Sequence, residues 1–213
     1  MDAPPSLLRL LPFLFAMLAP VAAFAADGPA PVGFVDKVEN EANVVSGDGA
    51  ATAIIGTPVY MKDELRTGAE GRLQVTFRDN TVLTLGEKAS VLIDRYVYDP
   101  ERDVGETVLQ ATKGAFRFAS GRIKGLKQSN IAVSTPAADI GVRGTEFWGG
   151  PMDQKYGVLL LEGEVTVSNQ AGRATLSTPG QGTDIPSPLD APGPVQAWSA
   201  DKIARAVATV ALH

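Results

Sequence analysis

The chain has 213 residues, a formal net charge of −5 at pH 7, a single histidine and no cysteine. Its mild acidity argues against nucleic acid or an anionic membrane surface as the partner. The lack of cysteine excludes disulfide bonds and lipid attachment through a cysteine, so a hydrophobic core alone must stabilise the fold.

The N-terminus has the order of a secretory signal peptide. Arg9 precedes an apolar run at residues 10–18, and Ala-Phe-Ala at residues 23–25 gives the small-x-small pattern of a cleavage site. A retained membrane anchor is the alternative, but the run is shorter than the roughly 20 residues that cross a bilayer. We therefore expect a signal peptide at 1–25, a short linker at 26–32, and a periplasmic mature protein with no lipid anchor.

The next part of the chain predicts strands. Apolar and polar residues alternate in short runs, which places side chains on opposite faces of a strand; these runs lie at residues 33–45, 73–77, 81–85, 89–98, 107–118, 156–161, 164–168 and 173–177. Asp79-Asn80 predicts one hairpin turn and Glu162-Gly163 a second. We expect a single all-β domain over residues 33–185, built as a sandwich, a roll or an irregular solenoid-like stack of many short strands.

The C-terminal region changes character. Residues 178–194 are rich in proline and glycine, which predicts a loop without regular structure. Ser199 can cap an amphipathic helix over about residues 200–212, so that 186–213 forms a loop followed by a helix. The apolar stripe of that helix either packs on the β domain beside Trp198 or docks a partner; packing is the ordinary use of such a stripe.

The residues that usually carry catalysis are missing. The single histidine, His213, is the last residue, where a side chain is seldom held in catalytic geometry. Histidine-assisted nucleophiles and His/Cys zinc sites are therefore excluded. Asp99, Glu101 and Asp103 could collect oxygens around Ca²⁺, but a solvated turn explains them as well. We expect no enzyme, no cofactor and no metal site; an enzyme that uses carboxylates alone is the remaining catalytic alternative.

The segment at residues 135–148 is unusual for a simple strand and turn. Pro136 restricts the backbone before a strand, and two glycines allow close approach or positive φ. Arg143 lies between small and apolar residues, so we expect it to be partly buried and paired with Asp139 or with the distant Asp63. The alternative is that Arg143 recognises a ligand.

These motifs resemble the FecR domain family. The resemblance rests on a K-D-E-L-R-T-G stretch, a hairpin with an Asp-Asn turn, a T-P-A…V-R-G-T-E-F segment and a later E-G-E-V-T-V element, and it covers about residues 33–185. The matching positions, which we expect to be mainly structural with a possible role in interaction, are Asp63, Thr67, Gly68, Asp79, Thr135, Pro136, Asp139, Arg143, Gly144, Thr145 and Phe147.

The resemblance implies a periplasmic β module that relays a signal from an outer-membrane receptor. Full-length family members control a sigma factor through a cytoplasmic anti-sigma segment. This sequence shows only a signal peptide before the domain, so we expect a stand-alone module that acts on a membrane-bound signalling protein. The alternative is an envelope-binding module that grips peptidoglycan or another polysaccharide through aromatic rings; the available rings are Tyr60, Tyr96, Tyr98, Trp148, Tyr156 and Trp198.

Overall fold

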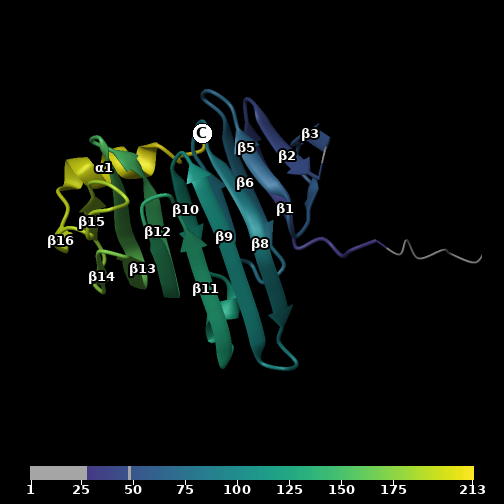
Figure 1. Cartoon of the computed structure of the whole chain (residues 1–213). Coiled ribbons are helices and arrows are strands. Elements are labelled where there is room, and N and C mark those ends of the chain that lie inside the picture. Colours follow the sequence, from purple (N-terminus) through teal and green to yellow (C-terminus); the bar gives the residue numbers. More distant parts are fainter. Residues whose placement is uncertain (1–27, 48) are drawn as a thin grey trace, which may run out of the picture.

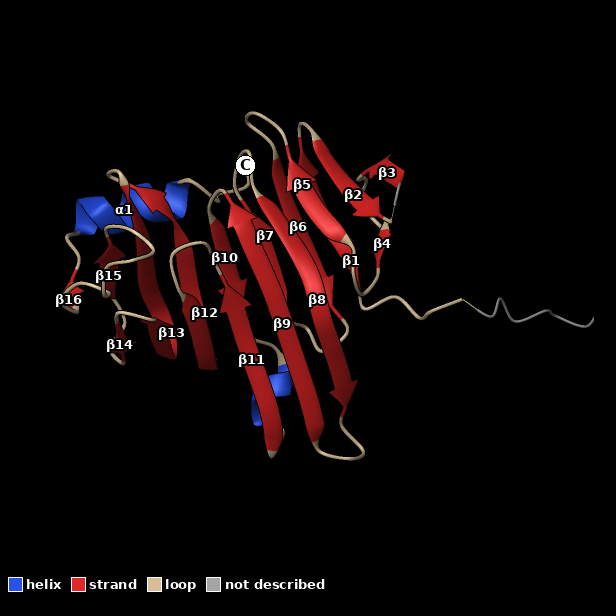
Figure 2. Cartoon of the chain, in the orientation of Figure 1, coloured by secondary structure: helices blue, strands red, loops and turns tan. Residues whose placement is uncertain are grey.

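The computed structural model describes residues 28–47 and 49–213, and strands dominate it (Figures 1 and 2). In chain order its elements are β1 (Gly33–Glu39), β2 (Ala42–Ser46), β3 (Gly49–Thr52), β4 (Pro58–Val59), β5 (Glu64–Thr67), β6 (Arg72–Phe77), β7 (Val82–Leu85), β8 (Ser90–Asp99), β9 (Val104–Lys113), β10 (Phe116–Ala119), the 3-10 helix η1 (Arg122–Gly125), β11 (Gln128–Ser134), β12 (Asp139–Met152), β13 (Lys155–Asn169), β14 (Gly172–Leu176), β15 (Gln181–Ile185), β16 (Gln196–Ala197) and α1 (Ala200–Ala208).

All of these strands belong to one continuous, curled sheet that divides into two arms along β12. The first half of β12 pairs with β11, which continues through β9, β8, β5 and β2 to β3. The second half pairs with β10, which continues through β7, β6 and β1 to β4. On its other side β12 pairs with β13 along its length, and β13 in turn pairs with β14 and β15. Every pairing is antiparallel except that of β9 with β11.

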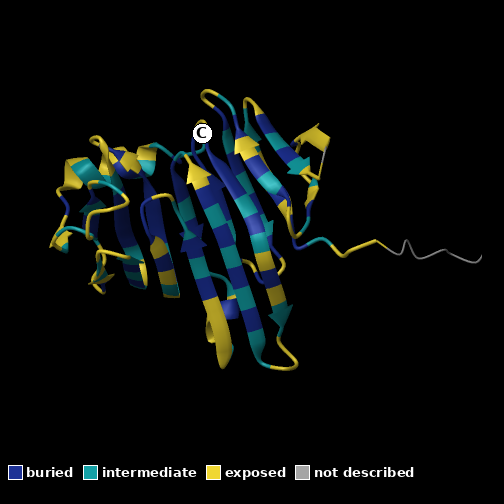
Figure 3. Ribbon diagram, in the orientation of Figure 1, coloured by how far each residue is buried: buried dark blue, intermediate teal, exposed yellow. Residues whose placement is uncertain are grey.

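The two arms face each other across a common core. The ring of Phe77 on β6 stacks on that of Tyr96 on β8, with centroids 5.3 Å apart, although the two strands belong to different arms. Buried and less buried residues alternate along β6, β9 and β10, as expected when one face of a sheet is covered (Figure 3). The all-β fold expected from the sequence is confirmed, in the form of a sheet rolled into two facing layers.

The bend between the arms is built into β12 and β13. Their register shifts between Arg143 and Phe147, where Gly144 has φ +63° and the facing Gly163 has φ +80°. A Cβ atom on Gly163 would lie 2.2 Å from the carbonyl oxygen of Gly144. Both the conformation and the close approach thus require glycine, and the paired strands turn here from one layer into the other.

The C-terminal helix packs on the outer face of the sheet, as the ordinary use of its stripe predicts (Figure 1). The Ser199 hydroxyl accepts a hydrogen bond from the amide of Lys202 and caps α1 at its N-terminus. The ring of Trp148 meets that of Trp198 edge to face, and the Trp148 indole donates to the Thr209 hydroxyl at 2.9 Å. The Lys202 ammonium lies 3.9 Å from the centre of the Trp198 ring and pairs with Asp184 at 2.7 Å.

Several local predictions are wrong. No hairpin turn lies at Glu162-Gly163, because β13 continues through a bend there; the turn between β12 and β13 is at Asp153-Gln154, both with positive φ. The region expected to be an unstructured loop contains β15, whose amides bond to β13 despite the prolines and glycines around it. The run at 107–118 is two strands separated by Gly114, and α1 ends at Ala208.

The predicted signal peptide lies outside the residues that the structure describes. Within the part that it does describe, no helix combines the length and apolarity needed to cross a membrane. The domain boundaries proposed from the sequence remain predictions.

Candidate functional site

Three of the motif residues lie at the two ends of β5, Asp63 before its first residue and Thr67 and Gly68 at its other end. Asp63 is buried, and its carboxylate accepts hydrogen bonds from the Ser46 hydroxyl at 2.5 Å and the Tyr60 amide at 2.7 Å. The buried Thr67 hydroxyl donates to the carbonyl of Gly86 and accepts from the amide of Ala89. Gly68 leaves room for the side chain of Glu41, which a Cβ atom there would meet at 2.5 Å. All three positions are thus engaged within the fold.

The Asp79 side chain forms more hydrogen bonds than that of any other motif residue. It is fully buried, and its carboxylate accepts hydrogen bonds from the Thr81 amide and hydroxyl, the Tyr96 hydroxyl and the Ile123 amide. Burial, together with the adjacent Asp79 carboxylate, raises the pKa of the Tyr96 phenol. Asn80 has φ +66° and closes the predicted hairpin between β6 and β7. Asp79 therefore ties that hairpin to β8 of the other arm and to η1.

Thr145 stabilises the bend of the sheet beside Gly144. Its buried hydroxyl donates toward the carbonyl oxygens of Arg143 and Glu164, at 2.8 and 2.6 Å, and accepts from the amide of Glu164 at 3.0 Å. The Thr145 amide donates to the Ser120 hydroxyl on the segment that follows β10. Two residues further on, Phe147 is fully buried in the core.

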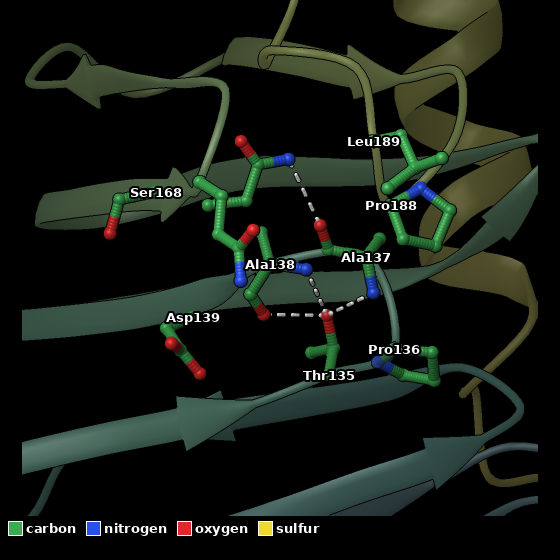
Figure 4. A pocket seen from close by; sticks show the side chains of 10 residues that line it. Thr135, Pro136, Ala137, Ala138, Asp139, Ser168, Pro188 and Leu189 are labelled. Carbon is green, nitrogen blue, oxygen red and sulfur yellow. Dashed lines mark hydrogen bonds between the residues drawn. The ribbon is translucent and has the colours of Figure 1, made fainter.

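Thr135 and Pro136 form the turn that leads from β11 into β12 (Figure 4). The Thr135 hydroxyl accepts from the amides of Ala137 and Ala138 and donates to the carbonyl of Ala138 at 2.7 Å. The side-chain Nδ2 of Asn169 donates to the carbonyl of Ala137 at 3.3 Å and so holds the turn against the end of β13. Pro136 is exposed at the tip of this turn.

The outward face of β12 carries two motif residues that face solvent, Asp139 and Arg143. Asp139, Gly141 and Arg143 alternate with inward-facing positions and are all exposed. The expectation that Arg143 is partly buried and salt-bridged is wrong, since its guanidinium forms no ion pair with any residue of the described chain. The carboxylate of Asp63, one of the expected partners, is bonded to the Ser46 hydroxyl instead. The other reason is the bulge at Gly144, which turns the strand directly after Arg143.

Three hollows lie along the first part of β12, from the turn before Asp139 to the bend at Gly144. One, of about 530 Å³, lies over the start of β12 between the Thr135–Asp139 turn and the exposed Leu189, as Figure 4 shows. A second, of about 280 Å³, has Gly141 on its floor, where a Cβ atom would meet nothing nearer than 3.9 Å. A third, of about 410 Å³, lies between Arg143 and η1. We call this run of hollows the β12 groove.

The lining of the β12 groove is largely polar. Its walls carry hydroxyls, amides and isolated charges, and the described residues contain no cluster of three or more acidic or histidine side chains that could hold a metal ion. The carboxylates of the 99–103 loop are engaged by neighbouring cations, Asp99 with Arg102 at 3.6 Å and Asp103 with Lys127 at 2.9 Å. The loop is therefore built as a turn with surface ion pairs.

Sequence reasoning missed the basic part of this groove. Lys124 and Lys127 line the hollow beside Arg143, but no motif marks them, and only the fold brings η1 next to the bend of β12. The two lysines and the arginine are the charged residues of that hollow's lining.

Comparison with known proteins identifies the segment that holds these motifs. Residues 63–166 match a family model described as FecR protein. This chain carries a FecR domain. The match begins at Asp63 and ends within β13, so it includes every motif residue named above and the central part of the β12 groove.

The solved structures that resemble the FecR-domain protein agree in fold. Two are crystal structures of a proposed anti-sigma factor from Parabacteroides distasonis, at 2.50 and 1.65 Å resolution. They superpose with TM-scores of 0.52 and 0.50 at 20% and 21% identity, over 66% of this chain. The chain spans 62% of the length of those relatives. No curated protein matches the sequence.

The motif residues thus do not converge on a single site. Asp63 lies before the start of β5, Thr67 and Gly68 lie at its end, Asp79 lies at the hairpin between β6 and β7, and Gly144, Thr145 and Phe147 lie at the bend and in the core. Pro136, Asp139 and Arg143 alone among them lie exposed along the β12 groove.

Proposed function

We propose that this FecR-domain protein is exported to the periplasm, where it relays a signal by binding a membrane-bound signalling protein, without catalysis of its own. The family match and the fold shared with a proposed anti-sigma factor support a regulatory role. The signal-peptide pattern of residues 1–25 supports export.

The single observation that carries the proposal is the placement of the most specific motif. A strand that only braced a fold would bury its distinctive residues, whereas β12 exposes Asp139 and Arg143 on a hollowed face with no resident occupant among the described elements. Exposed charged positions on a rigid, doubly paired strand are suited to contact another molecule.

The polysaccharide-binding alternative loses support from the aromatic rings. Sugars bind on rings that face solvent, but of the six rings Tyr96, Trp148 and Trp198 are buried, Tyr98 and Tyr156 pack against the core, and Tyr60 is half-buried. The Tyr96 hydroxyl is also engaged by Asp79.

A photo-crosslinking experiment in cells tests the proposal. A benzophenone amino acid replaces Asp139 in the β12 groove, and a matched control carries it at the exposed Lys37 on β1. We expect one recurrent membrane protein to be captured from position 139 and not from position 37. N-terminal sequencing of the FecR-domain protein itself should show that the mature chain begins after Ala25. Capture of cell-wall fragments would favour the polysaccharide alternative, and capture of no protein at position 139 would overturn the proposal.

A further inference from the structure

The N-terminal end of β11 has an open edge. β11 pairs with β9 over its whole length, from Gln128 to Ser134. Its pairing with β12 begins only at Ile131, opposite Val142, because β12 bends away at Gly144 and continues beside β10. The exposed first residues of β11 form the lower tip of that strand in Figure 3.

The direction of the backbone groups at this edge follows from the strand geometry. The Gln128 amide donates to the carbonyl of Asp103, toward β9. The amide and carbonyl of one strand residue point to the same edge, and the next residue's point to the opposite edge. The backbone groups of Ser129 therefore point to the side that β12 has left. An open strand edge is a template for another strand.

The charged side chains that line the hollow at the open edge are basic, although Glu164 lies opposite Arg143 on β13 and Asp103 contacts Lys127. Lys124, Lys127 and Arg143 surround the hollow, whereas the whole chain carries a net charge of −5. Within the described chain Lys124 and Arg143 form no ion pair, and Lys127 reaches Asp103 from a side chain that is 85% exposed. The same hollow is also lined by the apolar Leu126, Ile131 and Val142.

We infer that this end of the β12 groove binds an acidic, extended segment of the protein partner, which adds to β11 as a short strand beside Ser129. This inference rests on the proposed function, because it names the chemistry of that partner. Carboxylates of the segment would meet the three cations, and alternate apolar side chains would cover the apolar lining. A small anion would use the charges but neither the strand edge nor the apolar lining.

Binding of defined peptides to the full-length mature protein tests the inference. The probe is a fluorescent peptide that alternates glutamate and valine, measured by anisotropy, and a second peptide of equal charge has proline in place of valine so that it cannot pair as a strand. The variants are Lys124→Glu with Arg143→Glu, and a control that reverses two exposed charges elsewhere, Lys37→Glu with Lys155→Glu.

A backbone variant separates strand pairing from charge. Ser129→Pro removes the amide that faces the open edge and leaves every charge in place, whereas the pairing of Gln128 with β9 is kept. Circular dichroism and thermal melting establish that each variant is folded before binding is measured.

We expect the glutamate–valine peptide to bind the wild type and to bind the Lys124→Glu/Arg143→Glu variant at least about tenfold more weakly. The Lys37→Glu/Lys155→Glu control should bind as the wild type does, Ser129→Pro should lose most of the binding, and added salt should weaken it. Equal binding to both double variants, equal binding of the proline peptide, or no binding to the wild type would each overturn the inference.

The cellular crosslink distinguishes this inference from the proposed function. If the Lys124→Glu/Arg143→Glu variant still captures the membrane protein from position 139, the acidic-segment inference fails and the relay function stands. If the wild type captures no protein, the proposed function itself fails, whatever the peptides do.

Discussion

Replacing Asp79 by alanine should remove a large part of the stability of the fold. The carboxylate satisfies two backbone amides, those of Thr81 and Ile123, and both residues are fully buried. Each amide that is left without a partner costs about 1–3 kcal/mol. The bonds from the Thr81 and Tyr96 hydroxyls add about 1 kcal/mol each, because hydroxyls can turn toward other acceptors. The loss is then about 4–8 kcal/mol, comparable to the whole stability of many domains.

The assay is urea unfolding followed by tryptophan fluorescence. Trp148 and Trp198 are both buried, so exposure to water on unfolding should shift their emission. Asp79→Asn keeps one acceptor oxygen and should cost about 2 kcal/mol. Asp139→Ala is the control, since this exposed carboxylate should contribute less than about 0.5 kcal/mol. Equal losses for Asp79→Ala and Asp139→Ala would refute the structural role assigned to Asp79.

Three further variants test other parts of the structure. Gly163→Ala should lower the free energy of unfolding by more than about 2 kcal/mol, because its Cβ atom would meet a backbone oxygen at 2.2 Å. Gly141→Ala should lower it by less than about 1 kcal/mol, because no atom lies nearer than 3.9 Å to the new Cβ atom. Equal denaturation midpoints for the two variants would contradict this. The pKa of the Tyr96 phenol is raised in the folded state, so the unfolded chain loses this proton at a lower pH than the folded chain does. Above about pH 10 the free energy of unfolding should therefore fall by up to about 1.4 kcal/mol per pH unit. Tyr96→Phe should reduce this slope. Lys202→Ala removes the contacts with Asp184 and the indole ring and should cost about 1–2 kcal/mol in the same urea assay; an unchanged midpoint would show that the C-terminal helix does not depend on them.

Most strands could be predicted because their cause is local. Alternation of apolar and polar residues over 73–77 and 81–85 predicts the buried and outward faces of β6 and β7. Asp79-Asn80 between the two runs predicts the turn, where Asn80 has positive φ. The cap of α1 is also a local feature, since Ser199 needs only the residues that follow it. β15 escaped prediction because its pairing with β13 is supplied from elsewhere in the chain and outweighs the local proline and glycine signals.

Long-range geometry decided the features that the sequence could not show. Glu162-Gly163 has the composition of a hairpin turn, but the long partner strand β12 holds both sides of it and converts the turn into a bend. Arg143 has small and apolar neighbours in the sequence, which suggested burial, but its strand position places it on the outward face. Lys124 becomes its neighbour only through the packing of η1 beside β11.

The bend of β12 at Gly144 links the stability of this FecR domain to its proposed binding edge. The bend at Gly144 carries β12 from the first arm to the second, which closes the core over Phe147. The same bend takes β12 away from β11 and leaves the backbone groups of Ser129 without a strand on that side, while β9 still pairs on the other. A straight β12 would continue its pairing along β11, cover this edge and open the core. The glycine of the V-R-G-T segment is therefore needed for the fold, and the arginine beside it stands at the edge that the fold leaves open.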